Sequence, residues 1–366
     1  MRVVEVKKHV LSDYRRQERQ DLDDQSADVS KNEAFRKGYY AFTCLLWHPG
    51  LSRLICGHTN FANDLLHLFD PKIGRFESLG YASFAEKYEI KVHRSLALGG
   101  DGCVYAATSC LHGIDERLAA PGGKVFKWDP KTRRFTLLSI PCPPDYLQTI
   151  SLDYKRGMIC GMSYPVFNFF AYSIENNKVV YSQYMGSITH VGEVDDDGGY
   201  WGTWGHEHWL FRYDPVSNAV KFFRHGLPSK CESLMYPNAG PIDSMTSGGD
   251  GFLYIGSEKC EVYRLDPKTA EVAYLGKPLV SNRMPGLVAA DDGLIYGVGG
   301  NDDNVRVFTF DRKTRGFTIL GDVRDTATGD PCFRPHDLVK VGDSLFVGET
   351  DNPRRSDCLW ECRLGK

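Results

Sequence analysis

The sequence predicts an all-β fold, a seven-bladed β-propeller of four-stranded antiparallel blades. Two recurring features carry this prediction. An aromatic or apolar residue followed by Asp, and usually by Pro, returns along the chain, and a turn rich in Asp and Gly followed by an aromatic strand precedes most copies. Clear copies begin at Phe69, Trp128, Tyr213, Leu265 and Phe310, and degenerate copies lie around Tyr172 and Trp360.

The spacing of these copies gives the number of blades. Successive copies stand 41 to 59 residues apart, which is the length of one four-stranded sheet with its turns. The seven copies therefore predict seven blades. Sheets packed radially bury both faces and leave only short edges, whereas a large sandwich does not explain recurrence at this period.

The segment 91–135 shows the pattern of one blade most clearly. Its alternating apolar runs lie at 93–98, 103–108, 124–128 and 134–138, with turn residues GGDG and DPKT between strands. His93 opens the first run and His112 follows the second. In a hairpin these two positions lie at the same edge of the sheet.

The last repeat is one strand short, and the start of the chain offers that strand. Strand-like runs at 336–341, 343–349 and 359–364 have no fourth partner, while residues 2–10, RVVEVKKHV, form an isolated strand-like run. An open ring would leave an unpaired edge. We therefore expect one domain, 1–366, in which 1–10 close the seventh blade as its outermost strand. Residues 11–39 form a polar helix or loop packed outside, and 40–366 form the blades.

Composition limits the partners of the chain. With 42% hydrophobic and 25% charged residues and a formal charge of −3, it has no global charge that favours nucleic acid or membranes, so an acidic ligand needs a local basic cluster. No apolar run reaches the length of a signal peptide or membrane span, which predicts a cytoplasmic protein. Eleven irregularly spaced cysteines predict free buried thiols.

Polar residues mark one face of the predicted ring. In a propeller, the starts of the first strands and the ends of the second strands open on the same face of the central channel. This rule places seven of the eleven histidines there. Histidine suits proton transfer near neutral pH, metal ligation and hydrogen bonding to hydroxyl groups. The residues expected on this face are His58, Asn60, His93, His112, Gln148, Tyr164, His190, His206, His208, Ser244, Glu258, Arg283, Asn301, Arg334, His336 and Glu349.

Three chemistries are open for this set. The first is metal-dependent, with several histidines around a divalent ion, and His206 and His208 would share one face of a strand. The second is acid/base catalysis with histidine and Tyr164, and the third is binding alone, with the polar groups filling a hydrated channel. Neither GxSxG nor a P-loop occurs, and the face is poor in Asp and Glu, which disfavours glycoside hydrolysis.

VHRSLALGGDGCVYAAT with His93, then His112 and the tyrosine of GMSYP, resembles the seven-bladed polysaccharide lyases, the group of ulvan lyases and rhamnose-glucuronate lyases. The resemblance implies β-elimination at a uronic acid, in which the carboxylate is neutralised, a base removes the C5 proton and an acid protonates the departing O4. It implies His93, His112 and Tyr164 as catalytic residues, and we add His190 to the catalytic set as a substitute for an arginine of that family. A weaker resemblance, to the propeller that linearises streptogramin antibiotics, rests mostly on the fold.

The source of the neutralising charge is open. The lyase family pairs its tyrosine with a downstream arginine, and no arginine lies between Arg156 and Arg212. His190, Arg94, Arg283 or Arg334 are the substitutes, although Arg94 would point to the opposite side of a regular strand from His93. The residues expected to bind substrate are His58, Asn60, Arg94, Gln148, His206, His208, Arg283, Arg334 and His336.

We therefore expect a carbohydrate lyase that acts on a uronate-containing acidic oligosaccharide. The alternatives are a glycan-binding or small-ligand-binding propeller and a metal-dependent enzyme. The favoured chemistry requires no cofactor, and a divalent cation belongs to the metal alternative only. Which residue is base and which is acid, and the oligomeric state, stay open.

Overall fold

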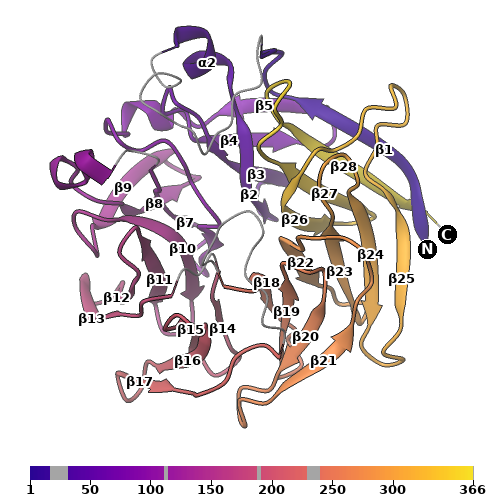
Figure 1. Ribbon diagram of the computed structural model, residues 1–366. Coiled ribbons are helices and arrows are strands. Elements are labelled where there is room, and N and C mark those ends of the chain that lie inside the picture. Colours follow the sequence, from indigo (N-terminus) through magenta and orange to yellow (C-terminus); the bar gives the residue numbers. More distant parts are fainter. Residues whose placement is uncertain (17–31, 111–113, 188–190, 229–239, 366) are drawn as a thin grey trace.

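Seven four-stranded antiparallel sheets stand in a ring around a central channel in the computed structural model (Figure 1). The structure describes residues 1–16, 32–110, 114–187, 191–228 and 240–365. The innermost strands contact one another around the whole ring. The predicted seven-bladed propeller is confirmed.

The strands of each blade follow one another from the channel outward, except in the last blade. Blade one has β2 (Ala41–His48), β3 (Arg53–Thr59), β4 (Leu66–Asp70) and β5 (Arg75–Ser78), and blade two has β6 (Leu96–Leu98), β7 (Val104–Ala107), β8 (Val125–Asp129) and β9 (Arg134–Ser139). Blade three has β10 (Tyr146–Asp153), β11 (Met158–Tyr164), β12 (Asn168–Ser173) and β13 (Lys178–Tyr184), and blade four has β14 (Glu193–Val194), β15 (Tyr200–Trp204), β16 (Trp209–Asp214) and β17 (Ala219–Phe222). Blade five has β18 (Ile242–Ser247), β19 (Leu253–Ser257), β20 (Val262–Leu265) and β21 (Val272–Gly276), and blade six has β22 (Gly286–Ala289), β23 (Leu294–Gly299), β24 (Arg306–Asp311) and β25 (Phe317–Asp322). Blade seven has β26 (Pro335–Val341), β27 (Ser344–Glu349), β28 (Cys358–Gly365) and β1 (Arg2–Val10).

The recurring aspartate motif is explained by its turn. Asp129 ends the third strand of blade two, and its Oδ1 accepts a hydrogen bond of 2.8 Å from the backbone N–H of Lys131. This side-chain bond stabilises the turn to the outermost strand, and Arg133 then takes the left-handed conformation with φ of 56°. The equivalent bonds to Asp70, Asp214, Asp266 and Asp311 have lengths of 2.8 to 3.0 Å.

The Asp-Gly turns between the first two strands also have a fixed structure. Asp101 accepts the backbone N–H of Cys103 and the hydroxyl of Tyr105, each at 3.0 Å, so the aspartate joins the turn to the aromatic strand that follows. The same aspartate–tyrosine bond occurs at Asp250 and Tyr254 and at Asp292 and Tyr296. The recurring sequence motifs therefore correspond to the turns that connect the strands of each blade.

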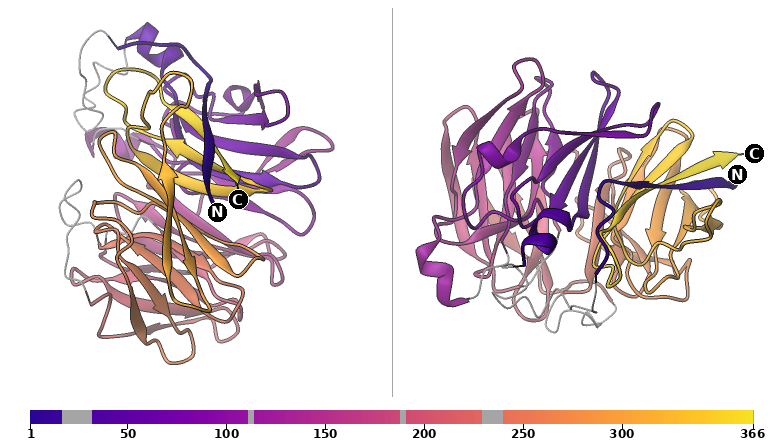
Figure 2. Two further views of the ribbon diagram at one scale, coloured as in Figure 1. Left: turned by 90° about the vertical axis from the view of Figure 1, so that its right-hand side faces the viewer. Right: turned by 90° about the horizontal axis from the view of Figure 1, so that it is seen from above.

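The N-terminal strand closes the ring, as predicted. β1 pairs antiparallel with β28, from Arg2 opposite Gly365 to Val10 opposite Cys358. The two strands lie side by side at the outer rim of blade seven in Figures 1 and 2. His9 fixes the register, because its Nε2 is 2.9 Å from Oε2 of Glu361.

The core lies between and within the blades. Side chains of neighbouring blades form shared apolar clusters, and one of them joins Val6 of β1 to residues of blades six and seven. The ten described cysteines are all free and buried, which confirms free thiols for these residues. Among the described helices, none has the length and apolar character needed to span a membrane.

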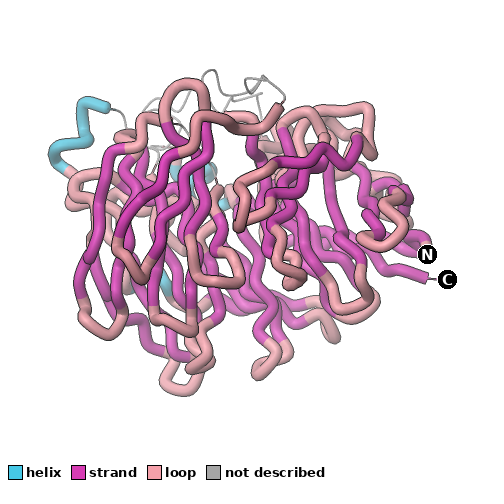
Figure 3. Tube along the Cα trace, turned by 90° about the horizontal axis from the view of Figure 1, so that it is seen from below, coloured by secondary structure: helices cyan, strands magenta, loops and turns pink. Residues whose placement is uncertain are grey.

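The face on which the innermost strands begin is called the mouth below. Within each blade the first strand runs away from the mouth, and the second returns to it. Figure 3 shows the strands running between two rows of turns. The segment 11–39 was predicted as a polar helix or loop packed outside, and its residues 17–31 lie outside the described residues. Its last part contains α2 (Glu33–Gly38), which lies on the mouth side and buries Phe35 (Figure 2, right). The short 3-10 helices are η1 (Tyr81–Ser83) and η2 (Ile114–Ala119).

Candidate functional site at the channel mouth

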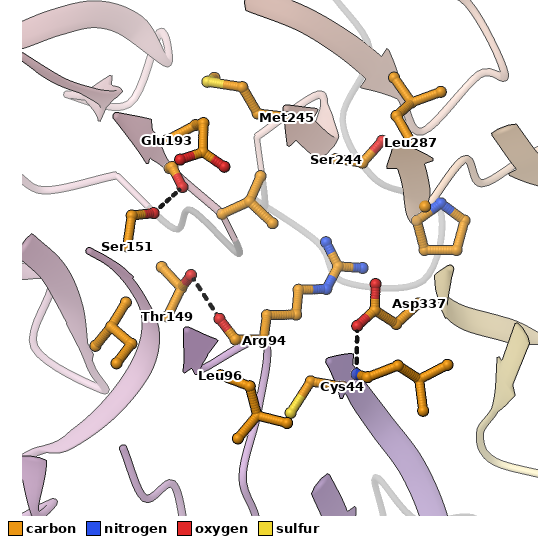
Figure 4. Close-up of a pocket in the computed structure, with 16 residues that line it drawn as sticks. Cys44, Arg94, Leu96, Thr149, Ser151, Glu193, Ser244, Met245, Leu287 and Asp337 are labelled. Carbon is orange, nitrogen blue, oxygen red and sulfur yellow. Dashed lines mark hydrogen bonds between the residues drawn. The ribbon is translucent and has the colours of Figure 1, made fainter. Parts of the chain in front are cut away.

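A cavity of about 200 Å³ occupies the central channel just inside the mouth. All seven innermost strands contribute to its wall (Figure 4). Polar side chains join neighbouring blades along this wall: Thr149 donates to the carbonyl of Arg94 at 3.1 Å, and Ser151 donates to the carbonyl of Gly192 at 2.7 Å. The cavity is therefore rigidly framed and lined by hydroxyl and carboxyl groups.

Two arginines converge on one buried carboxylate at the mouth. Arg94 belongs to the segment leading into blade two, and its guanidinium reaches across the channel to Asp243 in blade five, with Nη2 3.1 Å from Oδ1. Arg283 binds both oxygens of the same carboxylate, at 3.2 and 3.3 Å. Arg94 also donates to the carbonyl of Asp243, while its Nε is buried without a hydrogen-bond partner.

The direction of Arg94 differs from the prediction for a regular strand. The first strand of blade two starts at Leu96, three residues later than the predicted run, and Arg94 has a left-handed φ of 44°. This backbone turn breaks the alternation on which the prediction rested, so the side chain enters the channel (Figure 4). Arg283 also has a left-handed φ, of 72°. Such conformations are disfavoured for non-glycine residues, and they concentrate at functional sites.

Two predicted histidines meet beside the arginines. The rings of His93 and His336 are 4.8 Å apart between centroids and nearly perpendicular, at 80°. Nδ1 of His93 donates to the carbonyl of Gln148 at 2.7 Å, and because a carbonyl only accepts, this bond makes Nε2 the basic nitrogen. Gln148 thus contributes its main chain to the site.

The surroundings keep His336 neutral. Its side chain is buried, and Nδ1 has no hydrogen-bond partner. Burial, followed by the positive charges of Arg94, His93, Lys91 and Arg283, holds the pKa of His336 well below its usual value. These neighbours disfavour a proton on the His336 ring.

Carboxyl groups with perturbed acidity complete the cavity. Burial raises the pKa of Glu193 to about 7 and that of Asp337 to about 6, although Asp337 accepts backbone N–H groups from Leu45 and Leu338. Burial alone would also raise the pKa of Asp243, but Arg283 and Arg94 lower it to about 2. Asp243 is therefore ionised at neutral pH, whereas Glu193 is partly protonated and can donate a proton.

His58 and Asn60 do not point into the channel. The His58 ring packs 5.0 Å from that of His67 in the third strand of blade one, and its Nδ1 is 3.3 Å from the carbonyl of Ala41. Asn60 is fully buried and donates to the carbonyl of Tyr39 at 2.8 Å. Both residues lie at the predicted end of β3, but their side chains pack away from the channel, because the strand-end rule locates a residue along the strand and does not give the direction of its side chain.

His206 and His208 lie in the turn between β15 and β16, not on one face of a strand. The His206 side chain is 90% exposed at the tip of this turn, whereas Nδ1 of His208 is 2.8 Å from Oγ of Ser187. The left-handed φ of His208, 51°, separates their directions. The predicted shared face of the pair was therefore wrong.

The remaining predicted residues lie farther out on the mouth face or outside the described residues. Tyr164 ends β11 half-exposed, with its ring against Phe167. Arg334 donates from Nε to Oδ1 of Asn301 at 2.8 Å, between blades six and seven. His112 and His190 lie outside the described residues, so their predicted roles stay predictions.

Metal ligation requires several His, Cys, Asp or Glu side chains close together. Within residues 1–16, 32–110, 114–187, 191–228 and 240–365, no three His, Cys, Asp or Glu side chains gather as a metal ion requires. The cation at the centre of the described site is arginine.

Three acidic residues of the site were missed by the sequence analysis. Asp243 stands one position before Ser244, which the strand-start rule had selected, so a wider window at each strand start would have found it. Glu193 and Asp337 lie within the first strands of blades four and seven. Their proximity to Arg94 depends on the closure of the ring, which no local pattern reveals.

Comparisons with known proteins bear on the fold. No protein-family model matches the chain, and no curated protein matches it in sequence. A streptogramin B lyase structure is similar with a TM-score of 0.65 and 15% identity, covering 97% of this chain and 96% of that chain. The catalytically inactive variant of virginiamycin B lyase from Staphylococcus aureus with quinupristin has a TM-score of 0.61 and 13% identity, covering 99% of both chains. The WD40 repeats of RRP9 have a TM-score of 0.62 and 12% identity, covering 90% and 96%.

At these identities the similar structures show the propeller fold alone. They include lyases as well as WD40 repeats. The resemblance to ulvan and rhamnose-glucuronate lyases stays a prediction.

Proposed function

We propose that the chain is a carbon–oxygen lyase that cleaves a uronate-containing oligosaccharide by β-elimination at the channel mouth. The observation that carries this proposal is the convergence of Arg94 and Arg283 beside His93 and the neutral His336. A proton next to a carboxylate becomes acidic only when the carboxylate charge is offset, and a base can remove it only when that base is unprotonated.

In the proposed reaction the substrate carboxylate lies against the positive mouth. Arg94 has an N–H that is not used within the protein, and arginine binds carboxylates through a planar fork of donors. His93 removes the C5 proton, the C5–H electron pair forms the C4=C5 double bond, and the C4–O4 bond breaks. The departing O4 receives a proton.

Glu193 is the proposed proton donor. It lines the same cavity as Arg94, and its raised pKa leaves a large fraction protonated near neutral pH (Figure 4). Tyr164, the acid implied by the family resemblance, lies at the outer edge of the site and remains the alternative donor.

The lyases among the similar structures support this reaction class. One is named a streptogramin B lyase, and the virginiamycin B lyase variant that carries alanine in place of a histidine is described as catalytically inactive. These names concern other substrates, so the uronate preference rests on the two arginines at the mouth, Arg94 and Arg283.

The test is incubation with oligosaccharides of ulvan, alginate, pectate and glucuronoxylan, followed by ultraviolet absorbance of the unsaturated uronate. We expect product from at least one of them, and a loss of about 100-fold or more in kcat/KM for His93→Gln. Arg94→Lys keeps the charge but loses the planar fork, so we expect a smaller loss that falls mainly on KM.

The matched control is His48→Gln, because His48 ends β2 on the opposite face and its Nε2 is 3.0 Å from the carbonyl oxygen of Gly102. This variant should keep full activity. Absence of unsaturated product across the four glycans, or full activity of His93→Gln, would overturn the proposal. Glycan binding without product would instead assign a binding propeller.

A further inference from the structure

Several strands of blades three and four, which lie at the lower left of Figure 1, end on the mouth side in exposed aromatic residues. Tyr164 ends β11, Tyr184 ends β13 and Phe222 ends β17, and all three strands run toward the mouth. Their exposed fractions are 41%, 64% and 39%. Three large rings are thus open to solvent at neighbouring strand ends on one face.

Two tryptophans stand between these rings. Trp204 and Trp209 pair across the hairpin of β15 and β16, with ring centroids 5.4 Å apart, and both are half-buried. The Trp204 ring lies 4.9 Å from that of Phe222, and its Nε1 donates to the carbonyl of Phe223 at 3.0 Å. The indole of Trp204 is therefore held in one orientation.

Backbone hydrogen bonds join the turns that present these rings. The N–H of Met185 donates to the carbonyl of Phe167 at 2.8 Å, and the N–H of Gly205 donates to the carbonyl of Met185 at 2.7 Å. The link between blades three and four is thus fixed to a turn of each blade. The resulting surface, called the aromatic shelf, consists of Tyr164, Phe167, Tyr184, Trp204, Trp209 and Phe222.

Gly186 lets the Tyr184 ring lie close to this link. A Cβ at Gly186 would stand 3.3 to 3.5 Å from two ring carbons and the hydroxyl oxygen of Tyr184, and the glycine has a φ of 65°. The tyrosine therefore presents its ring beside the backbone of the link instead of folding into the core. An aromatic ring held this way keeps a flat apolar face available to a ligand.

The chemistry of the shelf fits a pyranose ring. Sugars have an apolar C–H face that stacks on aromatic rings and a rim of hydroxyl groups that seek polar partners. The polar side chains at the tip of the hairpin are His206, which is 90% exposed, and Glu207, whose Oε1 is 3.6 Å from Nδ1 of His206. The tip of this hairpin holds neither arginine nor lysine, in contrast to the arginine-rich mouth.

We propose that the aromatic shelf binds neutral pyranose units of the oligosaccharide whose uronate unit occupies the mouth. The binding of a uronate unit at the mouth rests on the proposed function. The binding of neutral units by the aromatic shelf does not. Tyr164 forms the inner end of the shelf, and the hairpin of blade four forms the outer end.

The test uses calorimetric titration with four neutral hexasaccharides, cellohexaose, xylohexaose, mannohexaose and chitohexaose, and with the corresponding disaccharides. We expect at least one hexasaccharide to bind, and its disaccharide to bind more weakly because it covers less of the shelf. Tyr184→Ala and Trp209→Ala should each raise Kd about tenfold, which corresponds to a stacked ring. Tyr184→Phe keeps the ring and should bind nearly as the wild type does.

The control variant is Tyr154→Ala, because Tyr154 is 59% exposed on the opposite face of the same blade. It should leave every Kd unchanged. No binding by any of the four hexasaccharides, or equal Kd values for Tyr184→Ala and the wild type, would overturn the inference. If the shelf variants weaken glycan binding but no elimination product forms, only the proposed reaction is contradicted. If elimination occurs but the shelf variants bind as the wild type does, only the shelf is contradicted.

Discussion

The guanidinium of Arg94 in blade two is bound to the carboxylate of Asp243 in blade five, across the central channel. Because the pair is buried and Arg283 shares the same carboxylate, removal of the negative charge leaves two guanidinium groups without it. This relationship leads to the first prediction.

Asp243→Asn should lower the free energy of unfolding by about 3 to 5 kcal/mol, the cost of breaking a buried ion pair. Urea denaturation at neutral pH measures it. The control is Asp322→Asn, because Asp322 pairs with Arg306 at 2.8 Å in an exposed position and should cost less than about 1 kcal/mol. If both variants lost the same free energy of unfolding, the buried ion pair in the channel would contribute no more to stability than an exposed one.

Acid should destabilise the fold through its buried histidines. Burial lowers the pKa values of His58, His67 and His336, so the unfolded chain binds more protons than the folded protein below about pH 6.5. Stability is therefore complete above that pH and is lost as the pH falls through the unfolded value. His58→Phe should reduce the loss between pH 7.5 and 5.5 by about 1 kcal/mol, measured by chemical denaturation at each pH.

The exposed His206 provides the control for this pH dependence. His206→Phe should leave the difference between pH 7.5 and 5.5 as it is in the wild type. A His58→Phe protein with an unchanged difference would show that this histidine titrates normally despite its burial.

Glu193 should give the opposite dependence on pH. Its pKa is raised by burial to about 7, so its contribution to stability is complete below its unfolded value and is lost as the pH rises through about 7. Glu193→Gln should therefore be more stable than the wild type at pH 8 by about 1 kcal/mol, as measured by thermal or urea unfolding. The exposed Glu175→Gln should show no such gain, and a wild-type profile for Glu193→Gln would refute the raised pKa of the Glu193 carboxyl group.

A charge introduced into β1 should destabilise the protein at the buried Val6 but not at the exposed Val4. Val6 is 4% exposed in a cluster with residues of blades six and seven, whereas Val4 is 42% exposed on the same strand. Val6→Asp should cost about 3 kcal/mol or more, because it buries an unpaired charge, and Val4→Asp should change stability by no more than about 0.5 kcal/mol. Urea midpoints of the two variants test this; similar midpoints would argue that β1 does not close the ring in solution.

The fold was predictable because each blade solves the same local problem with the same residues. Asp129 and its equivalents accept a backbone N–H two residues later, and Asp101 binds both its turn and Tyr105. These bonds are local in sequence, so they recur as a readable period. The closing strand followed from counting, since the last repeat lacked one strand and residues 2–10 had no other partner.

The site was predictable only in outline, because its contacts are not local. Arg94 and Asp243 are 149 positions apart, and they meet only because the ring brings blades two and five to one channel. The left-handed backbone at Arg94 has no signature, since arginine rarely adopts it. His58 shows the converse: its place at a strand end was predictable, but whether its ring faces the channel or His67 depends on packing.

The pairing of β1 with β28 determines when the ring can be completed during synthesis. His9 and Glu361, which fix this pairing, are 352 positions apart, whereas the strands of the other blades pair with their neighbours in sequence. Six blades can therefore form as they leave the ribosome. β1 emerges before them and stays unpaired until β28 has been synthesised. The exposed Glu5 and Lys7 within this strand provide charges that protect a waiting edge from pairing with other chains.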